Sequence, residues 1–580
     1  MRRTLRNLPL STSVLLGHVQ RGRAKGQSVV LRRLPTRARD RLTSTTVRSR
    51  RPDLAALALA AGGRAAEARV LLEDALARAG DGEEGARRRH GVAEAAVTLH
   101  QLDLAERALG AVPAELGDAR LAALVAAGQG RLSAALALLA GAGDARSRRL
   151  AGRLLGEVEV VRAEALREDL SAPRPPRRAF AAPVRVLHVV TNALPDRQAG
   201  YTIRTHGIVT AQRARGIDAR VVSRLGFPVD TGVVGAPPLV TVDGVPYHRL
   251  LPGSRVPPPG RARQDVAVRE LGALVERTGA ELLHAHSKHD NAQVALRVAR
   301  PLGLPVVYEA RGFLEETWRT EGGSADSDFY RWSRESETLC MASADVVVTL
   351  AEAMRQDIVG RGIDPDRVVV VPNAVPESFT APLPPAGAAR ERLGLPAEAF
   401  VLGTVTTLND YEGLDTVVEA LRLLDDPQFR LLVVGDGPAR PRLEALAAPL
   451  GDRVRFTGRV PHSAVREHLA ALDVFVVPRH ETPVTALVPP IKPLEALAVG
   501  VPVLASDLPP LVEIVRPGSY GEIAAAGDAA SWADQIASLG YAPEHVRALG
   551  GRAAAFVARE RTWTAAVDRY DAAYAITAHR

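Results

Sequence analysis

Glu495 is the first residue whose type and position suggest a chemical role. It lies near the start of a short predicted helix, KPLEALAVG at 492–500, which ends at Gly500. The free amide groups of a helix start favour an anion such as a phosphate, and a carboxylate accepts hydrogen bonds from two neighbouring hydroxyls at once. The simpler alternative is an acid that only complements the helix dipole.

Three histidines lie close together in the segment LLHAHSKHDNAQ. His284, His286 and His289 fall where a predicted apolar strand meets the next helix. Imidazoles at such a junction have two interpretations, either as ordinary polar residues of a loop or as ligands of a metal ion.

Two common nucleotide-binding motifs are missing from the sequence. The segment TNALPDRQAGYT, after the first predicted α/β strand, offers only Gly200 and no G-x-G-x-x-G, and no Walker-type loop occurs. Dinucleotide-dependent redox and ATPase functions are therefore disfavoured. The single cysteine, Cys340, excludes intrachain disulfides and all-cysteine metal sites, and we expect it to be a small buried residue.

Positive charge is concentrated at the amino terminus. Residues 1–52 hold 14 Lys or Arg against the single acid Asp40, whereas the whole chain has a net charge of +8, so the remainder is slightly acidic. A nucleic-acid partner is therefore not expected. The segment is predicted to be a solvated, disordered leader, and peripheral contact with an anionic membrane is the alternative.

The sequence contains no targeting or membrane-spanning signal that we recognise. No stretch approaches the roughly 20 apolar residues that cross a bilayer, and the amino terminus lacks a convincing signal-peptide cleavage site. The sequence predicts a cytoplasmic protein, which would lie at the inner membrane face if the basic leader binds lipid.

Residues 53–170 have the pattern of short Ala- and Leu-rich helices broken at glycines. A weak repeat places Arg64, Leu102 and Arg131 at equivalent positions, and the spacings of 38 and 29 residues bracket the roughly 34-residue period of tetratricopeptide-like repeats. Such repeats stack and usually bind partners, so this region is predicted to bind a protein. A helical cap without that function is the alternative.

The rest of the chain predicts an α/β architecture with two Rossmann-like, doubly wound domains. A Pro- and Arg-rich linker at 171–183 precedes them. Apolar runs alternate with helical segments over 184–378, and the same pattern restarts over 379–562, followed by a helix-like end at 563–580. Ligands of such sheets bind at the carboxyl ends of the strands, so a cleft shared by the two domains is expected.

Residues 184–575 resemble family 4 glycosyltransferases of the GT-B fold. The most specific part is PRHETPVTALVPPIKPLEALAVGVPVLASDLPPLVEIV at 478–515. The resemblance implies that Glu495 holds the ribose of a nucleotide sugar, that Leu494 belongs to the same donor site, and that the helix start faces the pyrophosphate. It also implies that the C-terminal helix packs back on the first, acceptor-binding domain.

Other segments extend the resemblance through both domains. LLVVGDGPARPRLEAL contains Gly435, and FTGRVPHSAVREHLAALDVFVVPR contains Gly458 and Val460; all three are implied donor contacts, the last two to the base. A tight turn alone would also explain Gly435. HVVTNALPDRQAGYTIRTHGI contains Gly200, which would let backbone approach the donor phosphate. By register in LLHAHSKHDNAQVALRVAR, His286 would lie beside the reacting sugar.

Two segments of the first domain resemble a subgroup associated with the assembly of surface polysaccharides. They are PVVYEARGFLEETW and SADVVVTLAEAMRQDIVGRGIDPDRVVVVPNAV. Glu309, Arg311 and Glu315 in the first of them are predicted to face the cleft on the acceptor side. Anchoring of the loop by salt bridges is the alternative for each residue.

The chain departs from the family pattern at two places. Leu487 occupies the position of a second glutamate that usually contacts the transferred sugar. Thr407 and Glu412 lie where many members present Arg and Lys to the pyrophosphate. Arg479 and Lys492 flank the predicted donor helix and could replace that positive charge at the leaving diphosphate. Ordinary surface cations are the alternative.

These features predict a transferase that moves a hexose from a nucleoside diphosphate sugar, with UDP or GDP as the nucleotide, to a hydroxyl of a saccharide or lipid-linked acceptor. The resemblance implies retention of anomeric configuration, with no metal ion and no cofactor. Two alternatives stay open, namely a sugar-nucleotide epimerase on the same fold and a non-catalytic protein that binds a nucleotide sugar or a partner.

Overall fold

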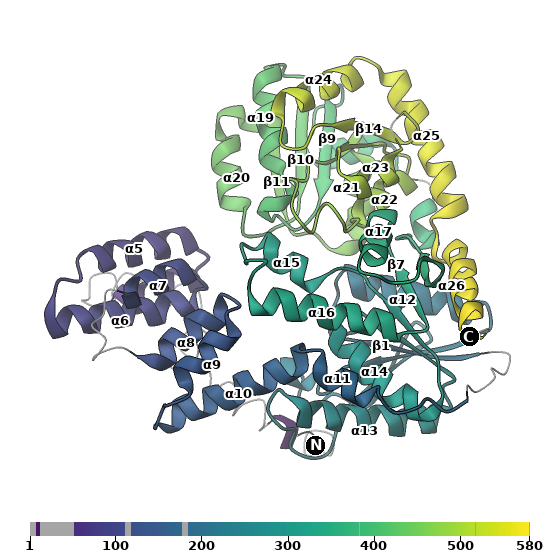
Figure 1. The fold of residues 1–580 in the computed structure, drawn as a ribbon. Coiled ribbons are helices and arrows are strands. Elements are labelled where there is room, and N and C mark those ends of the chain that lie inside the picture. The colour runs from purple at the N-terminus through teal and green to yellow at the C-terminus, as the bar shows by residue number, and fades with distance from the viewer. Residues whose placement is uncertain are drawn as a thin grey trace.

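The computed structural model describes residues 7, 9–11, 52–110, 118–176, 184–381, 383–516 and 518–578. These residues form a helical region followed by two α/β domains (Figure 1). The strands of the second domain's sheet are all parallel, and those of the first are parallel apart from the antiparallel pairing of β3 with β4. The predicted fold class, two Rossmann-like domains behind a helical segment, is confirmed.

The helical region is built from consecutive helices that pack in pairs, α4 with α5, α6 with α7 and α8 with α9. Arg64, Leu102 and Arg131 each lie at the start of the second helix of a pair. Assignment to tetratricopeptide-like repeats and the protein-binding role stay predictions. The helices are α4 (Pro52–Ala61), α5 (Ala65–Ala77), α6 (Gly82–Thr98), α7 (Leu102–Gly110), α8 (Ala119–Gly128), α9 (Leu132–Leu139), α10 (Ala145–Val161) and α11 (Glu164–Asp169).

The first α/β domain contains an eight-stranded sheet of order β3-β4-β2-β1-β5-β6-β7-β8. Apolar runs of the sequence at 184–190, 219–223, 281–285, 305–309, 345–350 and 367–371 predicted six of these strands, but not β3 and β4. These two form an antiparallel hairpin around Asp243 and Gly244, which both have positive φ, as a tight hairpin turn requires. The strands are β1 (Arg185–Val190), β2 (Asp218–Ser223), β3 (Leu239–Val242), β4 (Val245–Arg249), β5 (Leu282–His286), β6 (Val306–Glu309), β7 (Val346–Thr349) and β8 (Val368–Val370).

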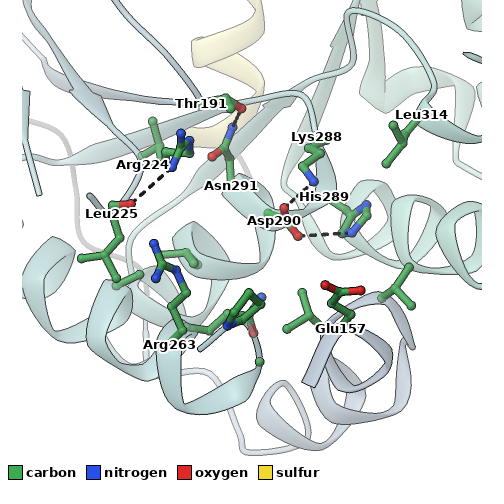
Figure 2. Close-up of a pocket in the computed structure, with 18 of the residues that line it drawn as sticks. Glu157, Thr191, Arg224, Leu225, Arg263, Lys288, His289, Asp290, Asn291 and Leu314 are labelled. Carbon is green, nitrogen blue, oxygen red and sulfur yellow. Dashed lines mark hydrogen bonds and ion pairs between the residues drawn. The ribbon is translucent and has the colours of Figure 1, made fainter. Parts of the chain in front are cut away.

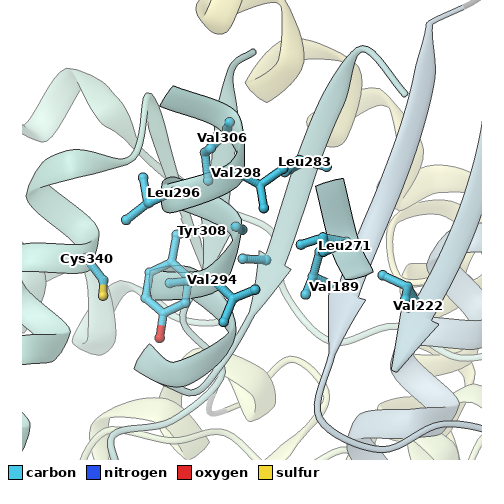
Figure 3. Close-up of a cluster of buried hydrophobic side chains, with 14 of the residues drawn as sticks. Val189, Val222, Leu271, Leu283, Val294, Leu296, Val298, Val306, Tyr308 and Cys340 are labelled. Atoms are coloured by element: carbon cyan, nitrogen blue, oxygen red, sulfur yellow. The ribbon is translucent and has the colours of Figure 1, made fainter. Parts of the chain in front are cut away.

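Helices connect these strands and cover the sheet, as in a doubly wound domain. They are α12 (Gly200–Ala214), α13 (Arg261–Thr278), α14 (His289–Leu302), α15 (Leu314–Thr320), α16 (Asp328–Ser343) and α17 (Glu352–Gly360), with 3-10 turns η2 (Val229–Thr231), η3 (Pro365–Arg367) and η4 (Glu377–Thr380). Figure 3 shows part of the core beneath them, where Val189 and Leu283 of the sheet meet Leu271 of α13 and Val294 of α14. Cys340 is fully buried in the same cluster, as predicted.

The second domain contains a six-stranded parallel sheet of order β11-β10-β9-β12-β13-β14. Apolar runs at 400–405, 429–435, 453–458, 472–478 and 501–506 predicted five of its strands, but not the short β14. The strands are β9 (Phe400–Val405), β10 (Phe429–Val434), β11 (Val454–Gly458), β12 (Val474–Val477), β13 (Val503–Ser506) and β14 (Gly521–Ala524). The helices are α18 (Ala386–Arg392), α19 (Leu414–Leu424), α20 (Arg440–Ala447), α21 (Val465–Ala470), α22 (Lys492–Ala498), α23 (Pro509–Val515), α24 (Ala529–Gly540) and α25 (Pro543–Glu560), with turns η5 (Asp410–Glu412), η6 (Ala448–Arg453) and η7 (His462–Ala464).

The C-terminal helix α26 (Trp563–Ala578) leaves the second domain and lies on the first, beside α12 (Figure 1). Trp563, Tyr570 and Tyr574 of this helix are buried there. A side chain at Gly207 would place its Cβ 2.3 Å from Trp563 Nε1, so the close approach of α12 and α26 requires glycine.

The described residues of the basic leader differ from the predicted solvated tail. Residues 7 and 9–11 are helical, Leu10 is fully buried in the first domain's core, and Asn7 Nδ2 donates to Val234 O at 2.8 Å. The apolar Leu10 is therefore removed from water, which explains the difference at these positions. Pro52 begins α4, and the other residues of the leader, with its predicted membrane contact, lie outside the described residues.

The described part of the predicted linker, residues 171–176, has no regular secondary structure and lies on the first domain. Arg174 forms an ion pair with Asp345 at 2.8 Å and donates from Nη2 to Leu304 O at 2.6 Å. Within the described parts of the chain, none of the helices combines the length and the apolar character needed to span a bilayer.

Candidate functional site

The two α/β domains meet where the loop between β12 and α22 touches the first domain. Val484 N donates to Thr320 Oγ1 at 3.1 Å, and Asn373 Nδ2 donates to Pro489 O at 3.1 Å. The loop therefore contacts the first domain both before and after Leu487, the residue found at the position of the family's second glutamate.

Leu487 lies in this loop, in place of that glutamate, and is half-buried. Together with Val488 it packs against the core of the first domain. The apolar side chain thus makes a contact between the domains that a carboxylate could not make without losing its hydration.

Glu495 lies in the first turn of α22 and is 5% exposed. Lys492 Nζ lies 2.8 Å from its Oε2 atom. The start of α12 faces this helix across the domain boundary, since a Cβ at Gly200 would be 3.6 Å from Ile491 Cδ1. Leu494 is 2% exposed in the second domain's core, so its side chain faces inward.

Arg479 forms an ion pair with Glu412, the acid found where the family resemblance implies a cation. Its Nε and Nη2 atoms donate to Glu412 Oε2 and Oε1 at 3.2 and 3.0 Å, and Nη1 donates to Val488 O at 3.3 Å. Both predicted phosphate-binding cations, Arg479 and Lys492, are thus paired with carboxylates. Arg479 is largely buried and so is not an ordinary surface cation, whereas Lys492 keeps a third of its side chain exposed, and both interpretations stay open for it.

His286 lies at the end of β5 in a buried, hydrogen-bonded cluster. Its Nε2 atom is 2.8 Å from His188 Nδ1, and His188 Nε2 is 2.8 Å from Gln212 Oε1. Because the amide oxygen can only accept, neutral His188 donates from Nε2 and accepts from His286. His286 is 2% exposed, so contact with a sugar requires its ring to move.

His284 belongs to the same cluster, and His289 does not. His284 Nδ1 is 2.8 Å from Tyr574 OH, whereas His289 lies 3.3 Å from Asp290, away from the cluster. Burial lowers the pKa of His188, His284 and His286, and nearby positive charge adds to the effect for His286.

The three imidazoles of this cluster differ from the predicted metal-binding set, because His188 takes the place of His289. Ligand atoms of His188, His284 and His286 lie within 4.8 Å of one another. Each ring forms a hydrogen bond with another protein group through at least one nitrogen, whereas His284 Nε2 and His286 Nδ1 form none among the described residues and lie 3.2 and 3.6 Å from Glu309 Oε2. That carboxylate is already paired with Arg204 and Arg311, whose guanidinium groups would repel a divalent cation. The arrangement favours a hydrogen-bonded cluster.

Glu309 is fully buried at the centre of the acceptor-side residues. Arg204 Nε and Arg311 Nε each donate to its Oε1 atom at 2.8 Å, and Tyr570 OH donates to Oε2 at 3.1 Å. Burial opposes ionisation of Glu309, but Arg311 and Arg204 outweigh it and hold its pKa well below the usual range. Glu309 is an anchor, as the salt-bridge alternative proposed.

Arg311 differs from Arg204 in having an unused donor. Arg204 uses all three nitrogens, whereas Arg311 Nη2 has no hydrogen-bond partner among the described residues. Arg311 Nη1 donates to Tyr201 O at 2.9 Å, in the first turn of α12. Its guanidinium therefore lies beside the start of α12, but Nη2 is buried, so an anion can use this donor only if the surrounding groups move.

Glu315 does not face a cleft. It is fully buried, and Arg361 Nη1 donates to its Oε1 atom at 2.7 Å. Arg361 also pairs with Asp357 and stacks over the Phe313 ring at 4.2 Å. The salt-bridged anchor, the alternative stated for this residue, describes it.

Gly435 and Gly458 adjoin one another at the carboxyl ends of β10 and β11. Gly435 N donates to Gly458 O at 3.0 Å, and a Cβ at Gly435 would lie 1.8 Å from Thr406 O. The close backbone packing accounts for Gly435 without a ligand. Val460 is partly buried against the second domain's core, and its predicted contact with a base stays a prediction, as does that of Gly458.

Sequence reasoning missed the residues that surround His286 and Glu309. Their signals are weak, because Arg204 and Gln212 lie in an ordinary helix and Tyr570 and Tyr574 lie 360 or more positions further on in α26. The alternation of β1 places His188 beside β5, but only the pairing of those strands identifies its neighbour.

Comparison with known families gives two adjoining matches. Residues 199–374 match the family model described as "Glycosyl transferase 4-like domain" and residues 399–540 match "Glycosyl transferases group 1". These ranges correspond to the two α/β domains and leave the helical region unmatched.

Among curated proteins, the chain is similar to two actinobacterial enzymes named D-inositol 3-phosphate glycosyltransferase. The enzyme of Thermomonospora curvata is 32% identical over 310 residues, which cover 50% of this chain and 70% of the relative. That of Geodermatophilus obscurus is 31% identical over 426 residues, which cover 70% of this chain and 92% of the relative.

Solved structures share the two-domain fold at low identity. Sucrose-phosphate synthase from Thermosynechococcus elongatus superposes with a TM-score of 0.56 at 21% identity, over 67% of this chain and 98% of that chain. Anabaena HepE in complex with UDP superposes with a TM-score of 0.53 at 17% identity, over 68% of this chain and 100% of that chain.

Proposed function

Since the chain belongs to the group 1 and 4-like family of glycosyltransferases, we propose that it transfers a hexose from a nucleoside diphosphate sugar to an acceptor hydroxyl. The observation that carries the proposal is the meeting of α12 and α22 across the domain boundary, with Gly200 against Ile491 and Glu495 one turn away. Neighbours of the same fold have been solved with UDP and with UDP-glucose, which supports a nucleotide sugar as donor.

Glu495 accepts hydrogen bonds from the two ribose hydroxyls in this proposal. Its carboxylate is almost buried, and one oxygen is already bonded to Lys492 at 2.8 Å. A partly desolvated carboxylate binds hydroxyl donors more strongly than an exposed one. Leu494 contributes through its backbone, because its side chain lies in the core.

In this proposal Lys492, Arg479 and Arg311 stabilise the diphosphate. Because each already pairs with a carboxylate, binding of the diphosphate must share or replace that pairing. Lys492 lies beside the donor carboxylate, and Arg479 is bonded to Glu412. Arg311 adds a guanidinium with an unused donor beside the first turn of α12. A leaving diphosphate gains negative charge as the glycosidic bond breaks, so fixed cations lower the barrier.

His286 orients the transferred sugar, and this role requires its imidazole to leave His188 when the donor enters. We propose retention of anomeric configuration without an enzyme nucleophile and without a metal ion. The acceptor is a saccharide or lipid-linked group in synthesis of surface polysaccharide or glycoconjugate. Inositol phosphate, named for the relatives, is a further acceptor to test.

Donor-release assays test the proposal. Purified full-length protein is incubated with UDP-, GDP- and ADP-sugars, with and without a cell-lipid extract, and free nucleoside diphosphate is measured. We expect release from one donor that rises with extract and is lost in Glu495→Ala but not in Glu544→Ala, which alters an exposed acid of α25. Epimerisation without release would indicate the epimerase alternative, and tight donor binding without either reaction would indicate the binding protein.

A further inference from the structure

A cavity of about 580 Å³ lies between the helical region and the carboxyl edge of the first domain's sheet. Figure 2 shows Glu157 of α10 on one side and, on the other, Thr191, Arg224 and Lys288 just beyond strand ends together with Asn291 of α14. Neither family match reaches α10, so one wall of this cavity comes from a part of the chain that the comparisons leave without a function.

The wall formed by α10 is closely fitted to the first domain. A Cβ at Gly156 would lie 2.2 Å from Pro259 O, and Gln293 Nε2 donates to Val160 O at 3.0 Å. Backbone contact of this kind leaves no space for a side chain. The helical region is therefore held in a fixed position over the cavity.

The polar edge of the cavity adjoins the proposed transfer site. Asn291 Nδ2 donates to Thr191 Oγ1 at 2.9 Å and to His286 O at 2.8 Å. Lys288 Nζ lies 2.7 Å from Asp290. A molecule in the cavity can thus reach the strand end that carries His286.

Arg263 of α13 is the cation of the cavity that lacks a carboxylate partner. Arg224 is paired with Asp230, whereas Arg263 forms no ion pair with an acid of the described residues and donates only to Pro257 O, at 3.3 Å. Burial lowers the pKa of Arg263; the carboxylate of Asp230 opposes this effect, and Arg224 adds a smaller lowering. A guanidinium in this setting is stabilised by an anion that fits its paired donors.

The rest of the lining is mostly apolar, with Gln264, His289 and Glu157, which pairs with Arg153, as further polar members. The apolar residues include Val160, Val161, Leu225, Leu250, Leu314 and Phe329. A second cavity of about 420 Å³ shares Val161 and Phe329 with the first and continues the apolar lining along the helical region through Leu121, Leu124 and Trp318. Apolar surface next to a partly buried cation suits a ligand that is itself anionic at one end and apolar at the other.

We infer that this cavity binds the acceptor of the transfer reaction as a phosphate ester with an apolar substituent, with Arg263 holding the phosphate and α10 covering the apolar part. Identification of the bound molecule as the acceptor rests on the proposed function. Binding of a phosphate ester in the cavity does not depend on turnover. It assigns the helical region a part in substrate binding besides any protein contact.

Calorimetric titration of the full-length protein with octyl phosphate tests the inference, with inorganic phosphate and octyl glucoside as the two partial ligands. We expect octyl phosphate to bind at least about tenfold more tightly than either one, because only it uses both parts of the cavity. Binding of inorganic phosphate as tight as that of octyl phosphate would contradict the inference.

Two variants locate the binding. Arg263→Gln is expected to weaken octyl phosphate binding by about tenfold or more, whereas Arg269→Gln, an exposed arginine of the same helix, should leave it unchanged. Val160→Phe, which fills the cavity from α10, should weaken octyl phosphate but not inorganic phosphate. Equal affinities in all variants with native circular dichroism would overturn the proposed site.

The donor-release assay on the same preparations separates the two proposals. Protein that releases nucleoside diphosphate but does not bind octyl phosphate contradicts the inference alone. Protein that binds octyl phosphate through Arg263 but never consumes a donor supports the cavity and contradicts the proposed function.

Discussion

Arg479 and Glu412 form a largely buried ion pair with two hydrogen bonds, whose N–O distances are 3.0 and 3.2 Å. The pair joins the loop after β9, which contains Glu412, to the loop between β12 and α22, which contains Arg479. Glu412 lies where the family resemblance implies a cation that binds the diphosphate. Its carboxylate also neutralises Arg479, the residue predicted to replace that missing positive charge. Donor binding must therefore compete with Glu412 or work alongside it.

Glu412→Gln is expected to tighten binding of the nucleoside diphosphate by about threefold to tenfold, because it removes the carboxylate that competes for Arg479. Arg479→Gln should weaken that binding by about tenfold. Calorimetry with UDP and GDP measures both. If both substitutions weaken binding equally, the pair is a structural unit and Arg479 does not contact phosphate.

Leu487→Glu is expected to destabilise the protein by about 1–3 kcal/mol and to lower activity, since it places a carboxylate against the first domain's core. Thermal unfolding and donor release measure the two effects. Leu487→Met, which keeps an apolar side chain of similar size, serves as the control. An active and equally stable Leu487→Glu protein would show that the position still accepts the family's glutamate.

Acid should destabilise the protein through its buried histidines. The pKa values of His188, His284 and His286 lie below the ordinary 6.5, so the unfolded chain takes up protons that the folded chain does not. Stability is then retained above about pH 6.5 and falls as pH drops below it, by about 1.4 kcal/mol per pH unit for each histidine that stays neutral. Urea unfolding at pH 7, 6 and 5 measures the trend, and nitrogen NMR that shows these rings titrating near 6.5 would refute it.

Docking of the helical region depends on Gly156. Gly156→Ala should lower the unfolding temperature of this region, because its Cβ would meet Pro259 O at 2.2 Å. Gly152→Ala in the same helix is the control, since nothing lies within 4 Å of its Cβ, and it should be neutral or stabilising by up to about 1 kcal/mol. Identical behaviour of the two variants would mean that α10 is not held against the first domain.

The strands that pack on both faces could be predicted from the sequence, because continuous apolar runs such as 184–190 and 400–405 have few other interpretations. The hairpin of β3 and β4 and the edge strand β14 lack that pattern, although Asp243-Gly244 is a turn signal that could have revealed the hairpin. The predicted strands were therefore those buried on both faces of the sheet. Strands that join the sheet by hydrogen bonds without such burial were not predicted.

The candidate site was less predictable, because its character depends on contacts between distant segments. Glu495 was found from its local pattern and Gly200 from the family resemblance, and the structure places their helices together. The partners that occupy Glu309 and Arg479 come from elsewhere in the chain, and a sequence alone does not show whether a charged side chain faces a ligand or a buried counter-ion.

Transfer of isotope-labelled sugar from the preferred nucleotide donor to an acceptor is the most direct test of the proposed activity. The full-length protein should form a labelled acceptor product, Glu544→Ala should form it at the same rate, and Glu495→Ala should reduce its formation by about tenfold or more, since the ribose loses a charged acceptor. A labelled product that forms equally well in Glu495→Ala, or no product with any donor, would contradict the account.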